Sequence, residues 1–196
     1  MRILVIGAHG TIGREIVNAL AGHEVIGASR SGSDVSVDIT DPSSILTMYT
    51  QVGKVDAVVC AAGSGAWKPL DQLNEDDFAR SLGYKLMGQV NVVRYGFASV
   101  NDGGSITTTS GVLSRSPMVG SAAISLVNCG LEGFTRAAAL EAPRGIRVNV
   151  VSPPWVTETL LEMGATDTSH GLPAGVVAQA YLRSITGSET GQVIEP

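Results

Sequence analysis

The stretch that decides the fold is Gly7-Ala8-His9-Gly10-Thr11-Ile12-Gly13, in which a glycine recurs at every third position. The apolar run Arg2–Ile6 precedes it, and Arg14–Ala21 follows it with apolar residues at helical spacing. A tight turn between a strand and a helix needs residues without a Cβ, and the free N–H groups at a helix start attract an anion. The stretch therefore predicts a diphosphate-binding turn inside a βαβ unit.

The spacing of these glycines differs from the usual G-x-G-x-x-G, so the prediction depends on their position between the first strand and the first helix. The residues expected to contact the diphosphate are Gly7, His9, Gly10, Thr11, Ile12 and Gly13. An alternative for His9 is a simple polar turn residue. The alternative for the whole stretch is that its glycines only turn the chain.

Apolar strands and helices alternate along the rest of the chain. The expected strands are Arg2–Ile6, Glu24–Ala28, Val35–Ile39, Val55–Cys60, Ser105–Ser110, Ile146–Val151 and Gln192–Ile194. The expected helices are Arg14–Ala21, Pro42–Tyr49, Asn74–Val100, Gly120–Ala142 and Ala174–Ile185. Strands that are apolar throughout and separated by helices predict a parallel sheet covered on both faces. The fold class is therefore α/β, a doubly wound, Rossmann-like parallel sheet, with residues 1–196 in a single domain.

The composition is that of a globular protein rather than a disordered one. Of the 196 residues, 44% are hydrophobic and 16% are charged. A formal net charge of −5 argues against a nucleic-acid partner, which would need clustered Lys and Arg. Three histidines do not indicate a metal site, and Cys60 and Cys129 are expected to be small buried residues. No apolar run reaches the roughly 18 residues of a membrane span, and Met1–Ile6 is too short for a signal peptide, so we expect a cytoplasmic protein without a membrane partner.

The end of the second expected strand indicates which nucleotide is bound. It reads Ala28-Ser29-Arg30-Ser31 and carries no acid that would hold a ribose 2′-hydroxyl. Arg30 can bind a 2′-phosphate as a fork, and Ser29 and Ser31 can donate further hydrogen bonds. The sequence thus favours NADP over NAD. Asp34 is the rival residue but lies beyond Gly32, and Arg30 is alternatively only a solvated strand end.

Further short motifs follow the strands in order. They are Asp38-Ile39-Thr40-Asp41, Ala61-Ala62-Gly63, Gly104-Ser105-Ile106, Leu131-Glu132-Gly133-Phe134-Thr135, Gly145-Ile146-Arg147-Val148-Asn149 with Ser152-Pro153, and Thr190-Gly191-Gln192-Val193-Ile194. In this order, and with the glycine turn, the chain resembles the short-chain dehydrogenase/reductase family along nearly its whole length. The resemblance implies an NAD(P)-binding domain. In such a domain Asp38 is expected to approach the adenine, and Ala62 and Gly63 are expected to flank the nicotinamide-side ribose. Further cofactor contacts are expected at Ile39, Ala61 and Pro153.

Catalysis in that family depends on a Tyr-x-x-x-Lys pair, a serine and an asparagine. Here the lysine position of the second long helix holds Asn128, and the tyrosine position holds Ile124. The serine position falls on Gly111, with Ser110 one place earlier, and the asparagine position falls on Lys85. The resemblance therefore implies a non-standard active site.

Lys85 and Asn128 together suggest a rearrangement of that site. If both side chains point into the cofactor cleft, the family's amide and ammonium have exchanged helices, and one positive charge lies beside the nicotinamide. The alternative is that Lys85 is an exposed helix lysine and Asn128 a satisfied interface amide. The candidate catalytic residues are Ser110, which would bind a carbonyl oxygen, Lys85, which could donate a proton if burial lowers its pKa, and Asn128.

Three functions remain open at this point. The first is an NADP-dependent oxidoreductase acting on a small carbonyl or alcohol. The second is a noncatalytic NADP(H)-binding protein, such as a redox sensor or a partner subunit. The third is a structural module whose cleft is a relic, and the glycine turn and Arg30 argue against it. The resemblance favours the enzyme.

The stretch Thr157–Pro173 is the one irregular region, rich in Gly, Thr and Ser. It is either a surface loop or a substrate lid, because ligands of open α/β sheets bind at the carboxyl ends of the strands, where this stretch leaves the sheet.

One side of the second long helix carries small residues, namely Ser121, Ala122, Ser125, Cys129, Gly133 and Ala137. This side either packs within the subunit or meets a second copy. Because members of the resembling family commonly pair through their two long helices, we expect a homodimer or homotetramer.

Overall fold

A computed structural model describes residues 1–196, and its seven parallel strands form one sheet in the order β3-β2-β1-β4-β5-β6-β7. The strands are β1 (Arg2–Ile6), β2 (Glu24–Ser29), β3 (Val35–Ser36), β4 (Val55–Cys60), β5 (Val100–Thr109), β6 (Arg147–Val151) and β7 (Val193–Ile194). The α-helices are α1 (Thr11–Ala19), α2 (Pro42–Val52), α3 (Glu75–Ser81), α4 (Gly88–Gly96), α5 (Ala122–Glu141), α6 (Thr157–Glu162) and α7 (Ala174–Thr186). This is the doubly wound α/β fold expected from the alternation of strands and helices.

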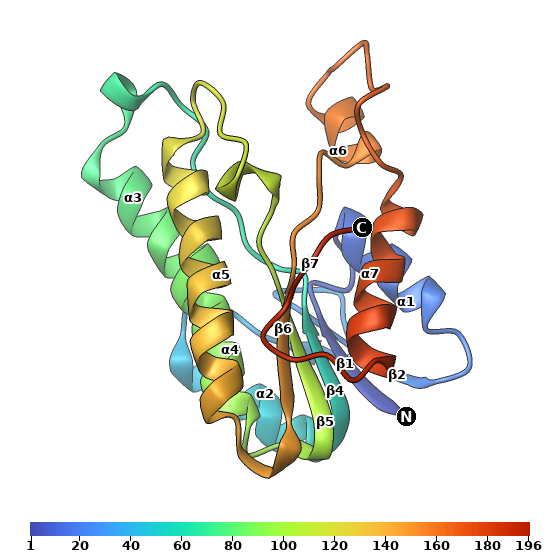
Figure 1. Cartoon of the computed structure of the whole chain (residues 1–196). Helices are drawn as coiled ribbons and strands as arrows, with labels where there is room; N and C mark the ends of the chain where they lie inside the picture. Colours follow the sequence, from blue (N-terminus) through green and yellow to red (C-terminus); the bar gives the residue numbers. More distant parts are fainter.

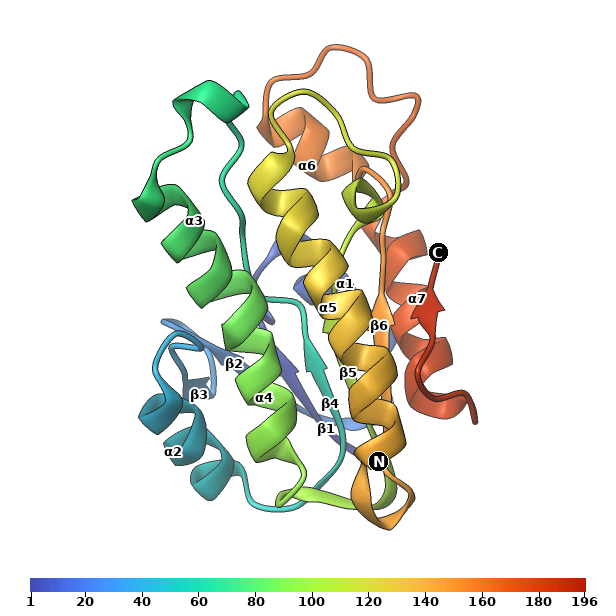
Figure 2. The ribbon, with the colours of Figure 1, turned by 60° about the vertical axis from the view of Figure 1, so that its left-hand side comes forward.

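Helices cover both faces of the sheet (Figure 1). On one face, α2, α4 and α5 share a hydrophobic core with Leu4 and Ile6 of β1, and on the other, α1 and α7 share a core with Ile3 and Val5. Alternate residues of β1 therefore enter two different cores, which explains why the strand is apolar at every position from Ile3 to Ile6. The helices α4 and α5 run side by side across their face (Figure 2). None of the helices has the length and apolar character needed to cross a bilayer.

The strand order reverses between β1 and β4, and this reversal places the site. Ile6 is in register with Cys60, so the segments that follow β1 and β4 leave the sheet at the same edge. Gly7 has a φ of +86°, and a Cβ there would lie 3.0 Å from the carbonyl carbon of Ala61. Only glycine fits such a position. Open α/β sheets bind ligands at such a reversal, beyond the carboxyl ends of the strands.

The long helix expected over Asn74–Val100 is interrupted. Between α3 and α4 the chain forms a π-helical turn, η2 (Leu82–Met87), and β5 already begins at Val100. A π-turn has a wider repeat than the 3.6 residues of an α-helix, and such turns often occur at functional sites. Apolar residues recur every four positions, at Phe78 in α3, Leu82 and Leu86 in η2 and Val90 in α4. The long helical segment was predicted, but the π-turn within it was not, because residues four positions apart also share one face of an α-helix.

The stretch Thr157–Pro173 is less irregular than expected, because it begins with α6. Leu160 is the buried residue of this helix, and Glu158 accepts a hydrogen bond from the backbone N–H of Ala174 at the start of α7 (2.9 Å). A helix of six residues is too short to show a clear periodicity in the sequence. Its role as a lid stays a prediction.

The small-residue side of α5 is only partly covered. Ser121 is buried, whereas Cys129, Gly133 and Ala137 are exposed. The expectation that Cys129 is buried is therefore wrong, and this part of the side does not pack within the subunit. Pairing of two subunits through it stays a prediction.

The contact between the glycine turn and α1 can be tested by adding one methyl group. A Cβ at Gly13 would lie 1.9 Å from the carbonyl oxygen of Gly7, so Gly13→Ala must displace backbone and should lower the free energy of unfolding by about 3 kcal/mol or more. The matched control is Gly175→Ala in α7, where the nearest atom is 3.5 Å away and the helix should gain up to about 1 kcal/mol. Urea unfolding of both variants measures the difference, and equal effects would contradict the close contact.

Candidate active site

The glycine turn presents unpaired backbone donors at the carboxyl end of β1. The N–H of Gly7 donates to the Ala28 carbonyl (2.7 Å) and that of Gly10 to the Gly7 carbonyl (3.0 Å). The first three N–H groups of α1, at Thr11, Ile12 and Gly13, make no hydrogen bond, and no acid lies in this first turn. These N–H donors and the positive end of the α1 helix dipole remain available to an anion.

A groove of about 360 Å³ runs from this turn across the ends of β1, β2 and β4. It gathers ten of the residues expected to contact a cofactor, namely Gly7, His9, Gly10, Ser29, Arg30, Ser31, Ile39, Ala61, Ala62 and Gly63. The other expected contacts do not line it: Thr11 and Asp38 face neighbouring pockets, and Pro153 lines the cavity described below. The unpaired N–H groups of the turn suit a diphosphate, and the glycines that line the groove let a ligand approach the backbone closely. Both features fit a dinucleotide.

Arg30 lies at the end of the groove where an adenosine 2′-phosphate is expected. Its guanidinium is 5.4 Å from the centre of the Tyr84 ring and has no acidic partner. The Ser29 hydroxyl bonds to the Ser31 carbonyl (2.6 Å), so it would have to leave this partner to reach a phosphate. The contact of Arg30 with Tyr84 was not predicted from the sequence, because Tyr84 belongs to the π-turn, 54 positions along the chain.

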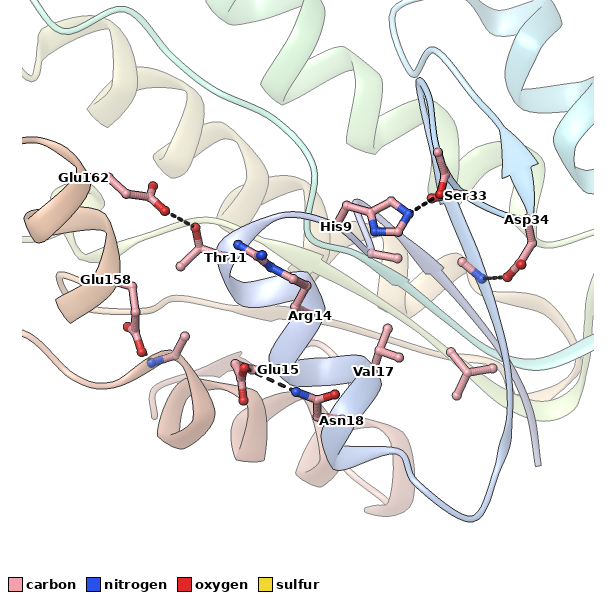
Figure 3. A pocket seen from close by; sticks show the side chains of 15 residues that line it. His9, Thr11, Arg14, Glu15, Val17, Asn18, Ser33, Asp34, Glu158 and Glu162 are labelled. Carbon is pink, nitrogen blue, oxygen red and sulfur yellow. Dashed lines mark hydrogen bonds between the residues drawn. The ribbon is translucent and has the colours of Figure 1, made fainter.

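Asp34 and His9 both hydrogen-bond to the backbone of this region. The Asp34 carboxylate accepts the N–H of Gly27 (2.9 Å) and lines a separate pocket of about 520 Å³ between α1, the end of β2 and α6 (Figure 3). The Nε2 of His9 donates to the Gly32 carbonyl (2.6 Å). On the far wall of this pocket, Thr11 donates to Glu162 of α6 (3.3 Å), so the expected lid segment lies against the start of α1.

Lys85 is buried, with 7% of its surface exposed. Its Nζ donates to the Ser110 carbonyl (3.1 Å) and forms no ion pair, and burial lowers the pKa of Lys85 to about 8. A Cβ on Gly63 would lie 3.1 Å from Cγ of Lys85, so the missing side chain at Gly63 makes room for the lysine. The alternative of an exposed helix lysine is therefore wrong.

Asn128 lies opposite, on α5, and is also buried. Its Nδ2 donates to the Gly111 carbonyl (3.3 Å), but its Oδ1 has no hydrogen-bond partner. The alternative of a satisfied interface amide is wrong for this oxygen. An unpaired buried acceptor costs about 1–3 kcal/mol, which a donor on a bound ligand could recover.

Ser110 is placed between two charged side chains. Its hydroxyl donates to Oε1 of Glu132 (2.9 Å), while its carbonyl accepts from Lys85. In this arrangement the proton of the hydroxyl is directed at Glu132, whereas Lys85 has N–H groups without a partner. The binding of a carbonyl oxygen by Ser110 stays a prediction.

The three candidate catalytic residues line one cavity of about 190 Å³ at the ends of β5 and β6. Its wall consists of Lys85, Ser110, Gly111, Val112, Leu113, Ile124, Asn128, Pro153, Pro154, Trp155, Val156 and Thr159. Lys85 is the one charged residue in this wall, and Gly63, which it contacts, lines the dinucleotide groove. The cavity and the groove therefore meet at Lys85.

Comparisons with known proteins identify relatives along nearly the whole chain. A family model described as enoyl-(acyl carrier protein) reductase matches residues 8–194. Short-chain dehydrogenase/reductase ABA4 of Pyricularia oryzae is 29% identical over 190 residues, which cover 90% of this chain and 70% of that protein. The crystal structure of protein lin1944 from Listeria innocua is 42% identical, with a TM-score of 0.95 over 100% of this chain and 98% of that one. A small-chain dehydrogenase in complex with NADPH is 27% identical, with a TM-score of 0.89 and coverage of 100% and 96%.

The burial of Lys85 predicts a pH-dependent gain of stability when the charge is removed. Because its pKa is about 8 when folded and about 10.4 in an unfolded chain, the charged side chain costs the folded state about 3 kcal/mol at pH 7. Lys85→Met should therefore raise the free energy of unfolding by up to that amount at pH 7. The gain should shrink as pH rises from 8 to 10, because the folded lysine then loses its proton.

Urea unfolding at pH 7 and pH 10 measures this gain. Lys54→Met is the control, since Lys54 donates to a backbone carbonyl, that of Ala98 (2.9 Å), but is exposed. If Lys85→Met gains the same stability at both pH values, the positive charge of Lys85 is not the source of the cost.

Proposed function

The chain belongs to the short-chain dehydrogenase/reductase family of oxidoreductases, and from that membership we propose that it is an NADP-dependent reductase or dehydrogenase of small carbonyls or alcohols with a non-standard active site. The observation that carries the proposal is the buried, unpaired ammonium of Lys85 where the dinucleotide groove meets the cavity. When bound, the nicotinamide cofactor supplies or accepts the hydride.

The chain's own residues would hold the cofactor at two points. The glycine turn would bind the diphosphate through the N–H groups of Thr11, Ile12 and Gly13, and Arg30 would bind the 2′-phosphate. Two features support NADP over NAD: the absence of an acid at the end of β2 and the diversion of Asp34 to the N–H of Gly27. A small-chain dehydrogenase of the same fold has been crystallised with NADPH.

Proton transfer would be the work of Lys85. In reduction, one of its free N–H groups holds the substrate carbonyl oxygen and gives it a proton as the hydride adds to the carbonyl carbon; the neutral amine regains a proton from solvent. In oxidation, the neutral amine takes the proton of the alcohol. A pKa of about 8 suits both directions near neutral pH. Ile124, Asn128 and Gly111 stand where the family has its tyrosine, lysine and serine, so no other acid is at hand.

The cavity indicates a small substrate without positive charge. About 190 Å³ corresponds to about six water molecules, taking about 30 Å³ for each. Its wall is apolar apart from Lys85 and the hydrogen-bonding groups of Ser110, Asn128, Trp155 and Thr159. A cation would be repelled by Lys85, whereas a carbonyl that becomes an alkoxide is stabilised by it.

Replacement of Arg30 should affect the binding of NADPH but not that of NADH. Because a charge-assisted hydrogen bond contributes about 1.5–3 kcal/mol, Arg30→Ser should raise the Kd of NADPH by about 10- to 100-fold and leave that of NADH unchanged. Arg94→Ser is the matched control, since Arg94 stacks on Tyr95 in the same way (5.5 Å) but lies on α4, outside the groove. Fluorescence titration measures both constants, and equal loss for the two cofactors would refute a 2′-phosphate contact.

The role of Lys85 predicts opposite pH dependences for the two directions. Carbonyl reduction needs the protonated amine and should fall as pH rises through about 8, whereas alcohol oxidation should rise over the same range. Lys85→Met should lower kcat by about 10²- to 10⁴-fold and abolish the inflection, with Lys54→Met unaffected.

A panel of small aldehydes and ketones, followed at the absorbance of NADPH, provides the rates. Tight NADPH binding without turnover of any substrate would favour instead a noncatalytic NADP(H)-binding protein. Full activity of Lys85→Met would overturn the assignment of the proton to this residue.

A further inference from the structure

Glu132 is a buried acid that the proposed chemistry does not use. It lies on α5, is 5% exposed and does not line the cavity. A buried carboxylate is costly unless it is paired and hydrogen-bonded, and this one has four partners on a single oxygen. Hydroxyl groups donate to Oε1 from Ser110 (2.9 Å), Ser114 (2.6 Å) and Ser152 (3.2 Å), and Arg115 approaches it to 3.5 Å.

These partners come from the segments that form the back of the cavity. Ser110 follows β5, Ser114 belongs to the short helix η3 (Val112–Ser114), and Ser152 follows β6. Arg115 also donates to the Ser152 hydroxyl (3.1 Å) and pairs with Glu195 near the chain end (3.0 Å). Glu132 therefore connects α5 by hydrogen bonds to the residues that follow β5 and β6.

The hydrogen bond to Glu132 matters more for the position of the Ser110 carbonyl than for the rest of β5. Its N–H is held by the sheet, through the Val151 carbonyl (2.9 Å), but β5 ends at Thr109 and its carbonyl leaves the ladder to accept from Lys85. The next residue is Gly111, which has no Cβ to restrict the backbone. The hydroxyl bond to Glu132 is the side-chain contact that fixes Ser110.

We propose that Glu132 is a positioning residue for Lys85: by holding the hydroxyl of Ser110, it keeps the Ser110 carbonyl where it accepts the hydrogen bond of the Lys85 ammonium. The inference rests on the proposed function only for the use made of Lys85. No other titratable or charged side chain lines the cavity on any of the elements that meet there, so Glu132, behind Ser110, is the charged group to consider.

Loss of this support should make the ammonium less stable. A hydrogen bond to a charged group contributes about 1.5–3 kcal/mol, so displacement of the Ser110 carbonyl should lower the pKa of Lys85 by about one unit or more. Glu132→Leu removes the acceptor. Glu132→Gln keeps an oxygen acceptor and the shape but removes the charge, and should leave the titration of Lys85 close to that of the parent.

The test follows the titration of Lys85 directly by NMR. The chain has three lysines, Lys54, Lys68 and Lys85, so protein labelled with ¹³C at lysine Cε gives three signals, and Lys85→Met assigns the third. Neither cofactor nor substrate is needed, so failure of the proposed reaction and failure of this inference are separate outcomes. Where activity is found, the inflection of the rate should move with the NMR midpoint.

Two further variants keep the inference testable if Glu132→Leu does not fold. Ser110→Ala cuts the same link at its other end and should lower the Lys85 midpoint in the same direction. Asp77→Leu is the matched control, because Asp77 is also a buried carboxylate, paired with Lys68 (2.8 Å) and Arg80 (2.8 Å) but outside the cavity wall.

A lowered midpoint in Ser110→Ala and Glu132→Leu, with Asp77→Leu and Glu132→Gln near the parent, supports the proposal. An unchanged midpoint in Ser110→Ala overturns it. A shift in Glu132→Gln as large as in Glu132→Leu shows that Glu132 acts through its charge and not through position, and an equal shift in Asp77→Leu shows general loosening; both outcomes also overturn it.

Discussion

The rest of the structure depends on the close packing of the start of α1 against the end of β1. The carbonyl of Gly7 lies where a side chain of Gly13 would begin, and the backbone of Ala61 lies where a side chain of Gly7 would begin. Three segments thus meet without side chains between them. This contact keeps the first N–H groups of α1 free and directs them, with the positive end of the helix dipole, towards the groove.

A second constraint is the burial of one positive charge. The π-turn between α3 and α4 carries Lys85, and the absence of a side chain at Gly63 makes room for it. Burial of an ammonium lowers the stability of the folded state, and proteins keep such groups mainly at functional sites. The same burial lowers the pKa of Lys85 to about 8. The irregular helix and the perturbed lysine are in this sense one feature.

Ser110 connects this positive charge with a negative one. It accepts from Lys85 through its carbonyl and donates to Glu132 through its hydroxyl, so it lies between two buried ions of opposite sign that do not touch each other. Glu132 is paired by three hydroxyl groups and Arg115, whereas Lys85 has a single carbonyl partner and N–H groups left over. Asn128, by contrast, lines the cavity and keeps one buried oxygen without a hydrogen-bond partner.

The sequence alone determined the order of strands and helices, the glycine turn and the position of Arg30 at the end of β2, because these follow from local spacing and from residues without a Cβ. The resemblance to the family added the hypothesis that Lys85 and Asn128 have exchanged the family's amide and ammonium between two helices. Only the tertiary structure decided that both are buried in one cavity, that the Ser110 hydroxyl is directed to Glu132, that Cys129 is exposed and that α6 rests on Thr11. These are contacts between residues tens of positions apart, and the period of a sequence carries no information about which distant side chain completes a hydrogen bond.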